Sequence, residues 1–232
     1  MQTETNNILK HIAIIMDGNR RWAVKQGLPK LIGHTEGGKN LKNIIRATLD
    51  RHIPFLTVWA LSTENLNNRS QEELTHLFSL FEKLVDQIED LTKNDIRVNI
   101  IGDISKLPTS TQNKLNLVAE KTKKNSKLNF NLAVNYGGRD ELIRAIHKII
   151  NAKLKPEDIN ENNFSNFLDT AQMPEPDLII RTAGDQRLSG FLPWQGVYSE
   201  LYFTPVEWPA FSEKELDQAI SWFDQQKRNR GK

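Results

Sequence analysis

Five runs of apolar residues alternate along the chain with segments in which apolar residues recur at helical spacing. The runs are rich in β-branched and aromatic residues and have the length of strands that are buried on both faces. They cover residues 12–16, 55–61, 96–101, 128–134 and 177–181. Because strands and helices alternate, we predict an α/β fold with a mainly parallel central sheet flanked by helices.

The segments between these runs predict the helices. Helices are expected at residues 20–25, 39–50, 70–91, 106–124, 140–152 and 162–169, and the Gly-rich residues 33–38 are expected to form a turn. In the 70–91 segment Ser70 is a typical N-cap, and acidic residues occupy the first turn. Its wide apolar stripe fits two readings, ordinary core or the wall of a tunnel for a long hydrocarbon. The stripe comprises Leu74, Leu77, Phe78, Phe81, Leu84, Val85, Ile88 and Leu91.

Composition narrows the class of protein. The 232 residues, 38% hydrophobic and 26% charged, suit one domain over residues 1–232, with flexible tails expected at 1–10 and 226–232. A net charge of +2 gives no global attraction to nucleic acid, and zero cysteines exclude thiolate chemistry. The polar start lacks a signal peptide, and no apolar run spans a bilayer. We expect a cytoplasmic protein with at most peripheral membrane contact.

Polar residues follow three of the predicted strands. Asp17 ends the first, Ser62 to Asn65 end the second, and Arg181 ends the last. Since parallel strands end at the same edge of a sheet, these groups are expected to meet there. Each cluster alone also has a simpler reading as a solvated surface turn. A carboxylate beside guanidinium groups, as at residues 17–21, is suited to binding a metal together with an anionic ligand. The two guanidinium groups and the hydroxyl in residues 181–189 are suited to binding a phosphate. Glu200 offers a second carboxylate for a hard cation.

In these pieces the sequence resembles the cis-prenyltransferases, specifically the bacterial undecaprenyl diphosphate synthases. The matching segments run in family order over nearly the whole chain, and together they are highly specific. They are residues 11–23, 33–37, 62–65, 135–139 (Asn-Tyr-Gly-Gly-Arg), 181–182, 187–189 and 200–203. The trans-type prenyl synthases carry an Asp-Asp-x-x-Asp motif, whereas this sequence contains no Asp-Asp pair.

The resemblance implies a reaction and a set of roles. Isopentenyl diphosphate is added to farnesyl diphosphate with Mg²⁺, giving a long-chain cis-polyprenyl diphosphate, and the enzyme is a homodimer. Asp17 is the main catalytic residue and with Glu200 binds Mg²⁺; Asn65 stands at the position of the proposed proton acceptor. The implied residues around the allylic diphosphate are Gly18, Asn19, Arg20, Arg21, Trp22 and His34. Those implied for isopentenyl diphosphate are Arg181, Arg187 and Ser189, and further substrate positions are Lys30, Ser62, Thr63, Glu64 and Leu188.

Some positions depart from the family pattern. Lys30 replaces a usual arginine and keeps the charge without the bidentate fork. Leu66, Asn67 and Asn68 replace the usual Trp-x-Arg, with Arg69 as a substitute one residue later. Residues 183–186 and 228–231 also differ, and these departures bear on product length and substrate preference. Two other readings remain: a non-catalytic partner subunit, which typically lacks the aspartate at position 17, and a metal-dependent phosphohydrolase, which would leave the 181–189 cluster unexplained.

Overall fold

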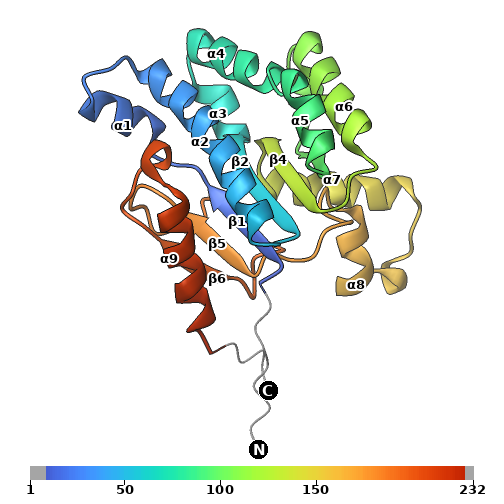
Figure 1. The fold of residues 1–232 in the computed structure, drawn as a ribbon. Coiled ribbons are helices and arrows are strands. Elements are labelled where there is room, and N and C mark those ends of the chain that lie inside the picture. Colours follow the sequence, from blue (N-terminus) through green and yellow to red (C-terminus); the bar gives the residue numbers. More distant parts are fainter. Residues whose placement is uncertain (1–8, 228–232) are drawn as a thin grey trace, which may run out of the picture.

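The computed structural model describes residues 9–227, and within them six parallel strands form one sheet in the order β3-β4-β2-β1-β5-β6 (Figure 1). The mainly parallel α/β fold is thereby confirmed. The five predicted strands are present to within two residues at each end, and β6 was not predicted. The strands are β1 His11–Ile15, β2 Phe55–Ser62, β3 Ile96–Ile101, β4 Leu128–Tyr136, β5 Leu178–Arg181 and β6 Glu200–Phe203.

Alternate residues of the strands supply two apolar cores, one on each face of the sheet. In β1, Ile12 and Ile14 belong to the larger core. Buried side chains of five helices also contribute to it: α2 (Lys30–Asp50), α4 (Gln71–Glu82), α5 (Ile88–Lys93), α6 (Thr109–Thr122) and α9 (Glu213–Asp224). Ala13 and Ile15 face the other way and pack in a smaller core with Tyr136 and Phe191. Successive side chains of β1 point to opposite faces of the sheet, and a core covers each face. Every position of the strand is therefore buried, which explains its unbroken apolar run.

Nine α-helices occur in the described part of the chain. They are α1 Asn19–Lys25, α2 Lys30–Asp50, α3 Thr63–Asn68, α4 Gln71–Glu82, α5 Ile88–Lys93, α6 Thr109–Thr122, α7 Gly138–Asn151, α8 Glu161–Phe164 and α9 Glu213–Asp224. None is long and apolar enough to span a membrane. The predicted tails fall mostly outside residues 9–227.

Two helix predictions were wrong in detail. The Gly-rich residues 33–38 lie inside α2, where packing against α1 and Trp208 overrides the weak helix propensity of glycine; the Trp208 indole N–H donates to the Gly37 carbonyl at 2.9 Å. The single helix predicted over 70–91 is divided into α4, a 3₁₀ turn at Val85–Gln87 and α5. Ser70 caps α4 as expected, its hydroxyl accepting from the Glu73 N–H at 3.3 Å.

A row of polar side chains crosses the smaller-core face of the sheet. The His11 Nε2 atom lies 2.7 Å from the Thr57 hydroxyl, which accepts from the Asn131 amide at 2.9 Å. The Asn131 carbonyl oxygen in turn accepts from the Asn99 amide at 2.8 Å. This polar ladder therefore joins β1, β2, β4 and β3 through side chains as well as through the backbone.

Candidate functional site

A polar chamber of about 230 Å³ lies at the carboxyl ends of β1, β2 and β5. It brings together side chains that are far apart in the sequence, as the shared sheet edge predicts. The lining residues that the sequence analysis named are Asp17, Asn19, His34, Ser62, Glu64, Asn65, Arg69, Arg181 and Ser189. Ser62 caps α3 by accepting from the Asn65 N–H at 3.0 Å, which holds Asn65 in the first turn of that helix.

Asp17 and Arg181 form the ion pair at the centre of this chamber. The Arg181 Nε and Nη2 atoms both donate to Asp17 Oδ2, at 2.9 and 2.7 Å. The Arg181 Nη1 atom donates to the Ser189 hydroxyl at 2.9 Å and to the Arg187 carbonyl oxygen. The Arg181 side chain is only 6% exposed, whereas that of Asp17 is 36% exposed. All three guanidinium nitrogens already donate within the chain, so an anion that binds Arg181 must share these donors with the Asp17 carboxylate.

The backbone around Asp17 is held by two distant segments. Its carbonyl oxygen accepts from the Thr182 hydroxyl at 2.7 Å and from the Trp208 N–H at 2.9 Å. The next residue, Gly18, has φ of 106°, and a Cβ atom there would lie 2.8 Å from Glu207 Cβ. Glycine is therefore required on both conformational and steric grounds. These contacts fix the turn that joins β1 to α1.

Glu73 joins three cationic or titratable side chains beside the chamber. Its Oε1 atom lies 2.9 Å from His34 Nε2 and 3.3 Å from Arg69 Nη1, and its Oε2 atom lies 3.8 Å from Arg20 Nη1. Burial lowers the pKa of His34 to about 4, with the Arg69 charge acting in the same direction. Burial also lowers the pKa of Arg69 from its usual value. His34 is consequently neutral at physiological pH.

From the sequence, Glu73 stands out only as an acidic first-turn residue, and this role is not predicted. A usable signal was present. Glu73 precedes Leu77 by one helical turn, so it lies on the apolar face of α4, and both residues are buried. A carboxylate on the buried face of a helix requires a partner, since an unpaired buried charge is costly.

A second, mostly apolar cavity of about 300 Å³ adjoins the polar chamber. The two share Met16, Asn19, His34 and Ala60 in their walls. From the predicted 70–91 stripe the cavity is lined by Leu77, Phe81, Leu84 and Leu91. The rest of its apolar wall comes from Leu41, Ile45, Leu80, Ile96, Phe130, Leu132 and Trp208. The stripe thus divides between core packing and a cavity wall.

Several predicted site residues do not line the polar chamber. The Arg187 guanidinium is 63% exposed and pairs with Asp185 at 2.7 Å, so only its backbone carbonyl meets Arg181. Arg21 also reaches Asp185, at 3.3 Å. Leu188 packs against the smaller core. The remaining predicted positions outside the chamber wall are Gly18, Arg20, Trp22, Lys30 and Thr63.

Glu200 does not lie beside Asp17 within this chain. It begins β6 and pairs with Leu178 at the start of β5, three residues before Arg181. Three residues of a strand span about 10 Å, so Glu200 lies toward the opposite edge of the sheet from the chamber. The implied binding of one Mg²⁺ by Asp17 and Glu200 stays a prediction. No cluster of three or more metal-binding side chains occurs within residues 9–227.

Comparisons with known proteins bear on this site. A family model described as "Putative undecaprenyl diphosphate synthase" matches residues 15–231. The isoprenyl transferase of Fusobacterium nucleatum is 45% identical over 226 residues, covering 97% of this chain and 96% of the relative. That of Clostridium tetani is 45% identical over 234 residues, covering 99% and 91%.

Two solved structures share the fold. Lavandulyl diphosphate synthase from Lavandula x intermedia, in complex with dimethylallyl diphosphate, superposes with a TM-score of 0.92 at 37% identity, covering 97% of this chain and 98% of that one. A probable undecaprenyl diphosphate synthase from Campylobacter jejuni gives a TM-score of 0.81 at 36% identity, covering 97% and 100%.

Proposed function

The chain belongs to the undecaprenyl diphosphate synthase family of prenyltransferases, and from this membership we propose that it adds isopentenyl diphosphate units to farnesyl diphosphate. The product is a long-chain cis-polyprenyl diphosphate such as undecaprenyl diphosphate, the precursor of the lipid carrier for cell-wall glycans. The protein acts in the cytoplasm, with peripheral membrane contact for product release.

The observation that carries this proposal is the junction of a polar and an apolar cavity. The polar chamber offers the Arg181 guanidinium and the Ser189 hydroxyl, groups that bind diphosphate. The adjoining cavity, lined largely by leucine, isoleucine and phenylalanine side chains, accepts the hydrocarbon. A substrate with a charged head and a long apolar tail fits this pair of cavities. A phosphohydrolase has no need of the second one.

Asp17 is the residue that would hold Mg²⁺. The ion usually takes one or two carboxylates and completes its coordination with water and substrate phosphate oxygens, which suits an accessible aspartate in a chamber without a dense acidic cluster. When bound, Mg²⁺ supplies charge stabilisation to the departing diphosphate. Glu200 is the second carboxylate that the family resemblance implies for this ion, and it begins β6.

The reaction itself requires positioning more than acid or base strength. The carbon–oxygen bond of the allylic diphosphate breaks, the double bond of isopentenyl diphosphate supplies the electron pair of the new carbon–carbon bond, and a proton leaves to form the cis double bond. Arg181 and Ser189 orient the isopentenyl diphosphate. Asn65, a neutral amide and therefore a weak base, orients the reacting groups beside them.

We also propose a homodimer. On α7, Ile143, Ile146 and Ile150 are 56%, 49% and 62% exposed, although they lie on one side of the helix. Val197 and Tyr198 are exposed two and three residues beyond Gln195, which contacts α7 through Glu141. A row of exposed apolar side chains along one side of a helix is typical of a protein interface.

The decisive experiment uses radiolabelled isopentenyl diphosphate with farnesyl diphosphate and Mg²⁺, and separates the products by chain length. The wild type is expected to give longer-chain diphosphates, and Asp17→Asn to lower turnover roughly a thousandfold while the protein stays folded, because a metal ligand contributes several kcal/mol. Asp224→Asn, on the exposed side of α9, is the matched control. Release of phosphate without chain growth would instead identify a phosphohydrolase.

A further inference from the structure

The loop that carries Arg187 and Ser189 packs against the junction of β4 and α7. The Gly138 N–H donates to the Gly190 carbonyl at 2.9 Å, and a Cβ atom on Gly138 would lie 2.1 Å from Pro193 Cδ. The buried Phe191 ring stacks on Trp59 with centroids 5.1 Å apart and meets the edge of Tyr136 at 6.2 Å. Residues 187–193, called the anion loop below, are therefore shaped by the Asn-Tyr-Gly-Gly-Arg motif at 135–139.

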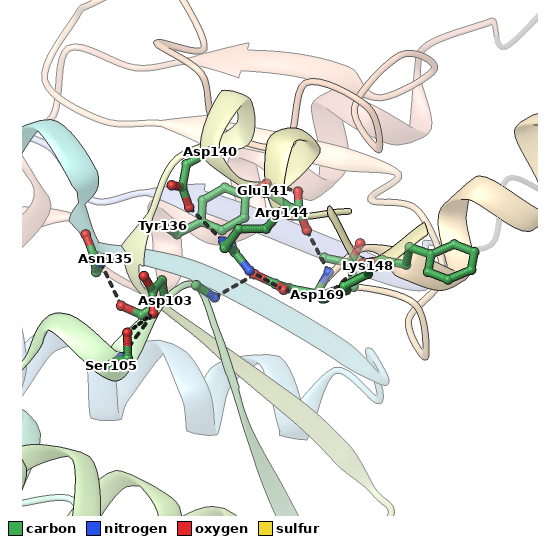
Figure 2. A network of polar contacts seen from close by, with 12 residues as sticks. Asp103, Ser105, Asn135, Tyr136, Asp140, Glu141, Arg144, Lys148 and Asp169 are labelled. Carbon is green, nitrogen blue, oxygen red and sulfur yellow. Dashed lines mark hydrogen bonds and ion pairs between the residues drawn. The ribbon is translucent and has the colours of Figure 1, made fainter. Parts of the chain in front are cut away.

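Glu141 is the buried polar centre of this junction (Figure 2). Its side chain is 1% exposed, and three donors converge on it. Oε2 accepts from the Tyr136 hydroxyl at 2.7 Å and from Gln195 Nε2 at 3.0 Å, and Oε1 accepts from the Asp169 N–H at 3.0 Å. Gln195 follows the anion loop and also donates to Thr170 at 2.7 Å. Glu141 thus joins the end of β4, α7 and the chain on either side of β5.

Glu141 does not line the polar chamber, so any effect on substrate must pass through its partners. Gln195 holds the C-terminal end of the anion loop, and Tyr136 supports Phe191 within it. At the other end of the loop, Ser189 and the Arg187 carbonyl meet Arg181 in the chamber. A shift at the junction would move Ser189 relative to Arg181, because Phe191, which packs at the junction, lies only two residues beyond Ser189.

We propose that Glu141 is a positioning residue for the isopentenyl diphosphate site, fixing the anion loop through Tyr136 and Gln195. This rests on the proposed function, because the assignment of isopentenyl diphosphate to Arg181 and Ser189 does. The carboxylate is suited to the task because its two oxygens accept all three bonds at once. An amide of the same size has one oxygen, and its NH₂ group faces donors.

Glu141→Gln and Asp169→Asn are a matched pair of variants. Both replace a carboxylate of one network by its amide, Glu141 being buried and Asp169 half-buried. The Asp169 carboxylate, however, accepts from Arg144 (Figure 2). It also accepts from the Gly102 N–H, and none of these donors belongs to the anion loop. General destabilisation should affect both variants, whereas a loss of loop position should appear only in Glu141→Gln. If Glu141→Gln does not fold, Tyr136→Phe replaces it, because it keeps the ring and removes one donor.

Two measurements test the proposal. Hydrogen exchange of the free protein follows the amides of Phe191 and Gly196, which donate to Leu188 at 2.9 Å and Leu192 at 2.8 Å. Their exchange should rise about tenfold or more in Glu141→Gln and stay near wild type in Asp169→Asn. In turnover, the KM for isopentenyl diphosphate should rise about five- to tenfold in Glu141→Gln, while kcat and the KM for farnesyl diphosphate change less than about twofold.

The outcomes distinguish failure of the positioning role of Glu141 from failure of the proposed function. Equal exchange in the two variants, or raised exchange with an unchanged KM for isopentenyl diphosphate, overturns the positioning role. A fall in kcat with both KM values unchanged overturns it as well. Absence of prenyl transfer in the wild type overturns the proposed function and with it the substrate assignment. The exchange result still decides whether Glu141 fixes the loop.

Discussion

His11 is expected to make folding sensitive to acid well above the range in which carboxylates titrate. The ring is 2% exposed, with Nδ1 2.7 Å from the Pro174 carbonyl and Nε2 2.7 Å from the Thr57 hydroxyl. Burial lowers the pKa of His11 from 6.5 to about 4, although the Pro174 carbonyl and Asp177 oppose the shift. The folded chain therefore keeps His11 neutral over a range in which the unfolded chain protonates it.

The sign and size of the effect follow from this difference. As pH falls below 6.5 the unfolded state gains a proton that the folded state does not bind, so the free energy of unfolding decreases until pH approaches 4. Each unit of pKa difference corresponds to about 1.4 kcal/mol, which gives about 2 kcal/mol from His11 between pH 7 and pH 4.5. His34, whose pKa is also lowered to about 4, adds a similar loss. Glu141 acts in the opposite sense, because burial raises its pKa and its protonation below that pKa favours the folded state.

Because the pH effects of His11, His34 and Glu141 add together in the wild type, the contribution of His11 is measured by substituting it. Urea unfolding, followed by circular dichroism at pH 7, 6, 5 and 4.5, should show His11→Gln to be less stable at pH 7 but to lose about 2 kcal/mol less than the wild type on acidification. The control is His52→Asn, an exposed position between α2 and β2 and outside α7, whose curve should run parallel to the wild type. Parallel curves for His11→Gln and the wild type would refute the reasoning.

Three further outcomes are expected. Arg187→Ala should raise the KM for isopentenyl diphosphate about ten- to a hundredfold, because the family resemblance implies that its guanidinium binds this diphosphate. Stability should change little, since the side chain is exposed, and equal effects on both substrates would show the assignment to be reversed. Leu84→Trp should shorten the product, because Leu84 lines the apolar cavity. Ile88 packs on the core, so Ile88→Trp should lower the free energy of unfolding by about 1–3 kcal/mol without changing the chain length of the product; the reverse pattern would place the tunnel elsewhere. Ile146→Asp should halve the mass measured by sedimentation, and an unchanged mass would argue against a dimer through α7.

The parts of the site that the sequence predicted well are those set by strand ends. Asp17 and Arg181 each follow an unbroken apolar run, and parallel strands leave such groups at one edge, so their meeting needed no knowledge of packing. Glu200 could not be placed in this way, because it starts a strand instead of ending one. The four residues of β6 are partly exposed, and their pattern gives no strong strand signal.

Helix–helix contacts were the other limit of prediction. The Gly-rich residues 33–38 have the composition of a turn, and only the contact of α2 with α1 and Trp208 explains why they are helical. Glu73 becomes part of the site because α2 brings His34 against α4. Neither contact follows from local sequence pattern, since both depend on which elements pack together after the sheet has formed.

The polar ladder has a consequence for how the strands find their alignment. Apolar side chains on a parallel sheet are largely interchangeable, so burial alone distinguishes poorly between pairings displaced by two residues, which keep the same face inward. His11, Thr57, Asn131 and Asn99 remove that freedom, because each group finds its partner only when β1, β2, β4 and β3 stand in the native alignment. A displaced strand would leave several donors and acceptors in a dry interior without partners, at about 1–3 kcal/mol each. The ladder thus fixes the register of four strands that are widely separated in the sequence. By fixing the register of β1, it also sets the position of Asp17 at the carboxyl end of that strand.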